Sequence, residues 1–192
     1  DYSQIELRII ASISKDKAMI EAFNAGEDIH TATAARVFGI DSNEVTREQR
    51  SHAKTVNFGI IYGVSAFGLS NQTNLSRKEA KELIESYFES YPGIKSYIDS
   101  QVIFARENGY VETLMGRKRY LKDINSANAV VRGHAERNAM NAPIQGSAAD
   151  IIKLAMINVH EAMLEKGFKS NMILQVHDEL VFDARLDELD EL

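Results

Sequence analysis

Four residues spaced four apart, Arg50, Lys54, Phe58 and Tyr62, form the pattern in this sequence that most suggests chemistry. On a helix each step of four turns about 40° beyond a full turn, so the four side chains would share one stripe. Two cations followed by two aromatic rings suit a polyphosphate that is joined to a flat base. From spacing alone, a solvated charged turn followed by an ordinary aromatic core contact is the favoured explanation of the pattern.

The acidic candidates lie far apart in the sequence. Asp178 and Glu179 follow His177 between two short apolar runs, where a tight hairpin would expose them, and Asp1 begins the sequence. Two aspartates brought side by side would repel each other unless cations lay between them, and a few hard oxygen ligands suit Mg²⁺. Taken singly, Asp178 and His177 are also explained as turn residues, and Asp1 as a frayed end.

A second run of residues four apart is polar: Arg137, Asn141 and Gln145, with Pro143 between the last two. Long guanidinium and amide side chains on one helix face can contact minor-groove acceptors without regard to base sequence. The alternative is an ordinary polar helix face.

Composition excludes several classes of protein. Of the 192 residues, 44% are hydrophobic and 26% are charged, which is typical of a globular domain. The absence of cysteine excludes disulfide scaffolds, thiolate zinc sites and cysteine nucleophiles. No apolar run approaches the roughly 20 residues that span a bilayer, so we expect no membrane partner.

The formal net charge of −6, taken alone, argues against a nucleic-acid-binding protein. The charge is unevenly distributed, however. The last ten residues hold five acids and one base, while bases gather locally at residues 117–119. The remaining body is nearly neutral and could bind a polyanion at one face.

The elements that must position these residues are predicted from periodicity and caps. Thr46 with Gln49, and Ser76 with Glu79, have the spacing of capping boxes. Pro143 should interrupt a helix that starts near Asn128, with Ser147 as a new N-cap. The predicted chain is α+β: a strand running into a helix over 1–13, helices within 17–38, 47–62, 77–91, 94–107, 128–140 and 147–166, and hairpins at 110–121 and 172–182.

Three segments carry a resemblance to a known family. Residues 1–8 (DYSQIELR) resemble motif A of family A DNA polymerases, the bacterial DNA polymerase I type. Residues 50–63 resemble motif B, on the fingers helix, and residues 176–179 (VHDE) resemble motif C. The three occur in the family's order, and residues 141–147 (NAPIQGS) are also similar to the family's sequence. Together they favour the functional interpretations over the alternatives given above.

The resemblance implies a DNA-directed DNA polymerase that transfers deoxynucleoside triphosphates onto a primer 3′-hydroxyl by a two-metal mechanism, in DNA replication and repair. Asp1 and Asp178 would hold two Mg²⁺ ions, for which Mn²⁺ could substitute, with the Tyr2 carbonyl as a further ligand. Glu179 would be an auxiliary acid. Lys54 would be catalytic as well as a phosphate ligand, because it could donate a proton to pyrophosphate.

The resemblance also assigns binding roles. Arg50 would clamp the phosphates together with Lys54, Phe58 would stack near the incoming sugar and base, and Tyr62 would lie at the template-base position. Glu6 would be the steric gate whose bulk excludes a ribose 2′-hydroxyl. The residues implied to contact the primer–template DNA are Arg137, Asn141, Gln145 and His177.

The implied architecture is a helical fingers subdomain, residues 14–129, inserted in an incomplete palm, residues 1–13 and 130–192, built on a small antiparallel β-sheet with packed helices. The thumb and N-terminal domains of the family would be missing. The implied location is the bacterial cytoplasm, with nucleoid association. One alternative is a non-catalytic nucleic-acid-binding fragment on the same scaffold. Another is a single-subunit RNA polymerase, in which a small residue is expected at the gate rather than the bulky Glu6.

Overall fold

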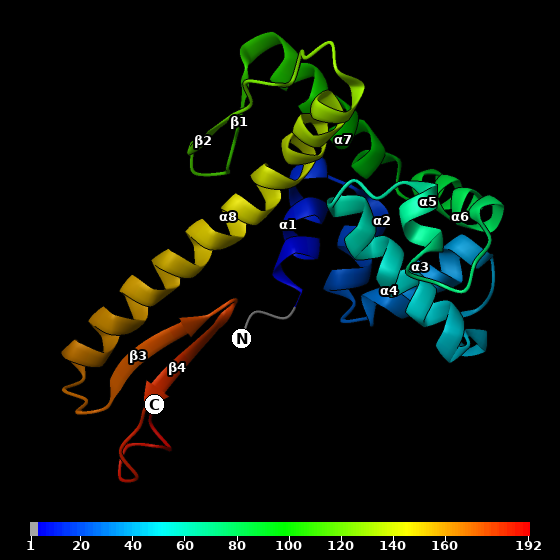
Figure 1. Cartoon of the computed structure of the whole chain (residues 1–192). Coiled ribbons are helices and arrows are strands. Elements are labelled where there is room, and N and C mark those ends of the chain that lie inside the picture. Colours follow the sequence, from blue (N-terminus) through cyan, green and yellow to red (C-terminus); the bar gives the residue numbers. More distant parts are fainter. Residues whose placement is uncertain (1–3) are drawn as a thin grey trace.

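The computed structural model describes residues 4–192 and is dominated by helices, with two separate two-stranded antiparallel sheets (Figure 1). This confirms the α+β class. In chain order the elements are α1 (Ile5–Ser14), α2 (Lys17–Asn24), α3 (Ile29–Phe38), η1 (Ser42–Glu44), α4 (Arg47–Ile61), α5 (Ala66–Ser70), α6 (Arg77–Ser90), α7 (Pro92–Asn108), β1 (Tyr110–Glu112), β2 (Lys118–Tyr120), α8 (Ala129–Glu165), β3 (Asn171–Val176) and β4 (Glu179–Asp183).

The start of α4, the helix that carries the cationic and aromatic stripe, is fixed by its cap. Thr46 accepts a hydrogen bond from the Gln49 N–H, and the Gln49 side chain accepts one from the Thr46 N–H. Ser76 and Glu79 form the same reciprocal pair at α6. Each capping box satisfies main-chain N–H groups that the first helical turn leaves unpaired. Both capping boxes are confirmed where the sequence places them.

The strand expected at the start of the chain is wrong for the residues that the structure describes. A helix, α1, already begins at Ile5. Leu7, Ile10 and Ala11 are almost fully buried and recur with helical spacing. The alternation that suggested a strand covers too few residues to outweigh this burial. Residues 1–3 lie outside the described part of the chain.

The break expected at Pro143 is also wrong, because α8 runs from Ala129 to Glu165 without interruption. Pro143 has no N–H to donate to the carbonyl of Ala139, yet the helix continues on both sides of it. Ser147, expected as an N-cap, instead donates its hydroxyl back to the Pro143 carbonyl from inside the helix. Arg137, Asn141 and Gln145 therefore share a single helix.

Two short elements were not predicted. Ser65 caps the five-residue helix α5, and Asp41 caps the single turn of η1. In both cases a small polar side chain accepts a hydrogen bond from a main-chain N–H at the start of the turn.

The main hydrophobic core gathers around α1, which packs against α2, α4, α7 and α8. A smaller core lies between the end of α7, the β1–β2 hairpin and the first half of α8. The fully buried members of the main core are Leu7, Ile10, Met19, Ile29, Val56, Leu69, Ala80, Tyr91, Ile94 and Ile144. Because α1 touches both α4 and α8, it fixes the two helices that carry most of the candidate residues.

The β3–β4 hairpin presents the acidic motif. Val176 pairs with Glu179, which leaves His177 and Asp178 as the two turn residues. His177 has a φ of 55°, a left-handed conformation that few residues other than glycine adopt. The register of the strands therefore brings Asp178 to the tip.

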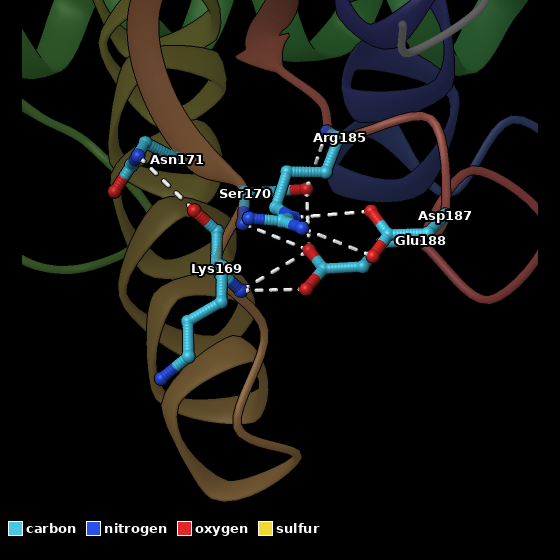
Figure 2. A network of polar contacts seen from close by, with 6 residues as sticks. All are labelled: Lys169, Ser170, Asn171, Arg185, Asp187 and Glu188. Carbon is cyan, nitrogen blue, oxygen red and sulfur yellow. Dashed lines mark hydrogen bonds and ion pairs between the residues drawn. The ribbon is translucent and has the colours of Figure 1, made fainter.

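The open end of this hairpin is closed by a polar network (Figure 2). The Glu188 carboxylate accepts hydrogen bonds from the N–H groups of Lys169 and Ser170 and from the Ser170 hydroxyl. The same hydroxyl accepts the N–H of Arg185. The hydrogen bond from Ser170 is the largest cause of the lowered pKa of Glu188. The network ties the segment after β4 to the start of β3.

Candidate functional site

The stripe predicted on α4 is present. Ala53, Val56 and Ile60 are buried, with at most 3% of each residue exposed, and Val56 and Ile60 belong to the main core. The opposite side of the helix leaves Lys54 exposed and Phe58 half-buried. Tyr62 follows at the C-terminal end of α4 and is 41% exposed. The helix thus offers a cation and then two rings to the same side.

Two cavities meet at the aromatic end of this stripe. One, which we term the α4–α5 cavity, has a volume of about 740 Å³ and is lined by Lys54, Phe58, Tyr62, Gln72 and Arg137, together with the Gly63–Ser65 loop. It is large enough for a nucleotide-sized group.

The second, which we term the α4–hairpin cavity, has a volume of about 390 Å³. Four separate segments contribute to it: Glu6 from α1, Phe58 and Tyr62 from α4, Gln145 from α8, and His177 and Asp178 from the β3–β4 tip. Residues more than 170 positions apart in the sequence therefore line one cavity. Phe58 and Tyr62 line both cavities and are thus a wall that the two share.

A hydrogen bond joins two of these segments. The Tyr62 hydroxyl donates to the Glu6 carboxylate over 3.0 Å. Burial is the largest cause of the raised pKa of Tyr62, with a smaller contribution from the charge of Glu6, while Gln145 acts in the opposite direction. The phenol therefore stays protonated at neutral pH and remains a donor to Glu6.

The two cations of the stripe differ in their surroundings. Arg50 donates to both carboxylate oxygens of Asp28, over 3.1 and 2.7 Å. The hydrogen bond to Arg50 holds the pKa of Asp28 far below its usual range, and the same bond raises the pKa of Arg50. Within residues 4–192, Lys54 forms no ion pair. Lys54 lines the α4–α5 cavity, and no carboxylate within residues 4–192 is paired with it.

His30 is a residue that the sequence reasoning missed. Its ring centroid lies 5.8 Å from that of Phe58, and its Nδ1 lies 3.1 Å from the amide nitrogen of Asn57. Asn57 also bonds Thr33, whose hydroxyl lies 3.0 Å from that of Tyr91. All four polar side chains are buried. Burial is the main reason that the pKa of His30 is lowered. No spacing links His30 to Phe58 in the sequence, so only the contact of α3 with α4 reveals it.

The candidates for nucleic-acid contact divide between the two cavities. Arg137 lines the α4–α5 cavity, whereas Gln145 and His177 line the α4–hairpin cavity. Asn141 lies half-buried on α8 between Arg137 and Gln145. Arg137 and Gln145 therefore line different cavities that share the wall formed by Phe58 and Tyr62.

The candidate metal ligands are only partly described. Asp178 lines the α4–hairpin cavity, and Glu179 follows as the exposed first residue of β4. Asp1 and Tyr2 lie outside the described residues. In residues 4–192, no three His, Cys, Asp or Glu side chains group closely enough to hold a metal ion. The carboxylate oxygens of Asp178 suit a hard cation, but that carboxylate needs further ligands from elsewhere.

Comparisons with known proteins agree on one family. The sequence profile of DNA polymerase family A matches residues 1–192. The chain is 60% identical over 190 residues to DNA polymerase I of Caldicellulosiruptor bescii and 58% identical over 193 residues to that of Streptococcus pneumoniae serotype 4. The two matches cover 99% and 100% of this chain but only 22% of each relative. The chain therefore spans about a fifth of the length of these relatives.

A solved structure is similar throughout. It is the POL domain of Pol1 from M. smegmatis in complex with DNA primer–template and dNTP. The TM-score is 0.94 at 50% sequence identity, and the match covers 100% of this chain and 34% of that one. Among the described helices, none is both long enough and apolar enough to cross a membrane.

Proposed function

This chain belongs to DNA polymerase family A, and we propose that it forms the part of a DNA-directed DNA polymerase that binds the incoming nucleotide and the primer end. The observation that carries the proposal is the α4–hairpin cavity. There Glu6, Tyr62, Gln145 and Asp178, which come from four separate segments, line one space.

The stripe on α4 suits the incoming deoxynucleoside triphosphate. Lys54 would supply a cation for the phosphates and would donate a proton to the departing pyrophosphate. Arg50, one turn earlier, is held by Asp28 and would exchange this carboxylate for a phosphate. Phe58 offers its ring to the sugar and base. Glu6, held by the Tyr62 hydroxyl, fills the space that a ribose 2′-hydroxyl would need.

The acidic tip suits divalent cations. We propose that Asp178, together with Asp1 and the Tyr2 carbonyl, holds two Mg²⁺ ions, with Mn²⁺ as a possible substitute and Glu179 as an auxiliary acid. Bound there, the ions would supply activation of the primer 3′-hydroxyl and stabilisation of charge on the leaving group. The contribution of the chain is to hold the Asp178 carboxylate at a two-residue turn, in the same cavity as the gate residue Glu6.

The polar face of α8 suits the primer–template DNA. Gln145 and Asn141 carry amide donors that fit minor-groove acceptors, and His177, at the hairpin tip, lines the same cavity as Gln145. Arg137 lies in the α4–α5 cavity, where the cation fits template phosphates and the outer face of Tyr62 fits a template base. The wall formed by Phe58 and Tyr62 would thus separate the template side from the nucleotide side.

The proposed division of the chain is fingers at 14–129 and an incomplete palm at 1–13 and 130–192. The relatives are bacterial DNA polymerases I about five times as long, so we propose that thumb and N-terminal domains complete the enzyme. The proposed role is DNA replication and repair in the bacterial cytoplasm, in association with the nucleoid.

The Asp178→Asn variant of the complete polymerase tests the proposal. We expect nucleotide incorporation to fall by at least about 100-fold, because the variant removes a charge that the metal ions need, while primer–template binding persists. Asp183→Asn, at the other end of β4, is the matched control and should leave incorporation unchanged. Equal activity of Asp178→Asn and the unaltered protein would favour a non-catalytic nucleic-acid-binding fragment instead.

A further inference from the structure

The turn between β1 and β2 is held on α8 by a group of hydrogen bonds that the proposed function does not use. Thr113 donates its hydroxyl to Asp150 Oδ2 over 2.7 Å, and Arg117 Nε donates to Asp150 Oδ1 over 3.0 Å. Arg117 Nη2 also donates to the Gly146 carbonyl over 3.1 Å. The Leu114 N–H donates to the Ser147 hydroxyl over 2.9 Å. We call these contacts of Thr113, Leu114 and Arg117 with residues 146–150 the hairpin clamp.

The clamp is partly shielded from water. The Asp150 side chain is 11% exposed, although that of Arg117 is 54% exposed. Burial alone would raise the pKa of Asp150, but the hydrogen bonds from Thr113 and Arg117 outweigh it and lower the pKa. The carboxylate is thus ionised at neutral pH, and both of its oxygens are engaged by the hairpin.

The clamp contacts α8 in the turn that follows Pro143. Pro143 leaves the carbonyl of Ala139 without its usual main-chain donor. One turn later, the Ser147 hydroxyl bonds the Pro143 carbonyl, and the same hydroxyl accepts the Leu114 N–H. The hairpin therefore fixes the direction of α8 just after the position at which a proline permits bending.

The clamp and the α4–hairpin cavity occupy opposite faces of α8. At about 100° per residue, Gln145, Ala148, Ala149 and Ile152 share one face, which lines the cavity. Pro143, Gly146, Ser147 and Asp150 share the opposite face, which meets the hairpin. A shift of the clamped face therefore rotates or displaces Gln145 within the cavity.

We propose that the hairpin clamp is a positioning device for Gln145, holding its amide at the minor-groove edge of the primer terminus. Thr113, Arg117 and Asp150 are positioning residues because they touch neither the cavity nor its acidic tip. The proposal rests on the function proposed above, in which Gln145 contacts the primer–template.

Gly146 makes the proposal testable by suppression. A Cβ added at Gly146 would lie 2.5 Å from Thr113 Cγ2, so Gly146→Ala must push the hairpin and α8 apart. Thr113→Ser removes Cγ2 but keeps the hydroxyl that binds Asp150. In the double variant the nearest remaining atoms are Arg117 Nη2 at 3.6 Å and the Cβ of residue 113 at 3.8 Å, which are ordinary contacts.

The experiment measures single-nucleotide extension by the complete polymerase on primers that end in adenine or in 3-deazaadenine, which lacks the minor-groove acceptor N3. The unaltered protein should extend the 3-deazaadenine primer about tenfold less efficiently, the effect of one lost hydrogen bond. Gln145→Ala should abolish this penalty. Gly146→Ala should reduce the penalty to twofold or less, and Gly146→Ala/Thr113→Ser should restore it.

Two further variants distinguish loss of the clamp from a general folding defect. Arg117→Gln removes an exposed cation of the clamp and should also reduce the penalty. Arg106→Gln, which breaks the ion pair of α7 with Glu136 on α8, should leave it unchanged. A full penalty in Gly146→Ala or Arg117→Gln, alongside its loss in Gln145→Ala, would overturn the inference while leaving the proposed function intact. A full penalty in Gln145→Ala would refute the minor-groove role of Gln145, and the inference with it.

Discussion

The bond between Tyr62 and Glu6 gives a quantitative prediction about sugar selection. If Glu6 is the steric gate, the Tyr62 hydroxyl that donates to it over 3.0 Å holds the gate in place. Tyr62→Phe keeps the ring that lines both cavities and removes only this donor. Glu6→Ala removes the gate itself.

The magnitude of each effect follows from the geometry. A hydrogen bond to a charged group contributes about 1.5–3 kcal/mol, but Tyr62 is 41% exposed, so water can partly replace it. We take the contribution of the Tyr62–Glu6 hydrogen bond as about 1 kcal/mol, which corresponds to about a fivefold change in the ratio of the two insertion efficiencies. Tyr62→Phe should therefore increase ribonucleotide insertion relative to deoxyribonucleotide by about fivefold. Glu6→Ala should increase it by roughly 100-fold or more, because the steric barrier is gone.

The assay is steady-state insertion of ATP and dATP opposite thymine by the complete polymerase, compared as ratios of kcat/KM. The double variant is the decisive measurement. Since Tyr62 acts on the sugar only through Glu6, Glu6→Ala/Tyr62→Phe should show the ratio of Glu6→Ala alone. Multiplicative effects of the two changes, or a change of less than twofold in Tyr62→Phe, would refute this reasoning.

Two other outcomes follow from the site. Lys54→Ala should raise KM for nucleotide by about tenfold or more and leave primer–template affinity nearly unchanged, whereas equal losses would contradict the phosphate role. Burial lowers the pKa of His30 from its ordinary 6.5, so the unfolded chain binds this proton more readily than the folded one. Stability should therefore be complete above about pH 6.5 and decrease as the pH falls below it. Urea unfolding at pH 7.5 and 5.5 checks this, and His30→Gln should reduce the dependence.

Local signals in the sequence predicted most helix boundaries well. The capping boxes at Thr46 and Ser76 involve residues only three apart, so their hydrogen bonds do not depend on the rest of the fold. The stripe on α4 was predicted for the same reason, because helical geometry alone aligns residues spaced four apart. The β3–β4 turn followed from two apolar runs separated by polar residues.

The errors arose where distant contacts decide the outcome. Helix α8 continues through Pro143, and the β1–β2 hairpin holds the turn that follows it, but nothing near Pro143 in the sequence indicates a partner at Arg117. Burial by four other helices makes α1 helical from Ile5. His30 reaches Phe58 only because α3 packs on α4.

The wall shared by the two cavities has a thermodynamic consequence. Phe58 and Tyr62 bound the spaces on both sides, so an occupant that shifts their rings in one space alters the other. Such coupling is reciprocal: if the proposed template base and nucleotide occupy the two spaces, whatever factor the base imposes on nucleotide affinity, the nucleotide must impose on affinity for that base. A poor fit between base and nucleotide would then weaken the binding of both through these two rings, before any phosphodiester bond is made.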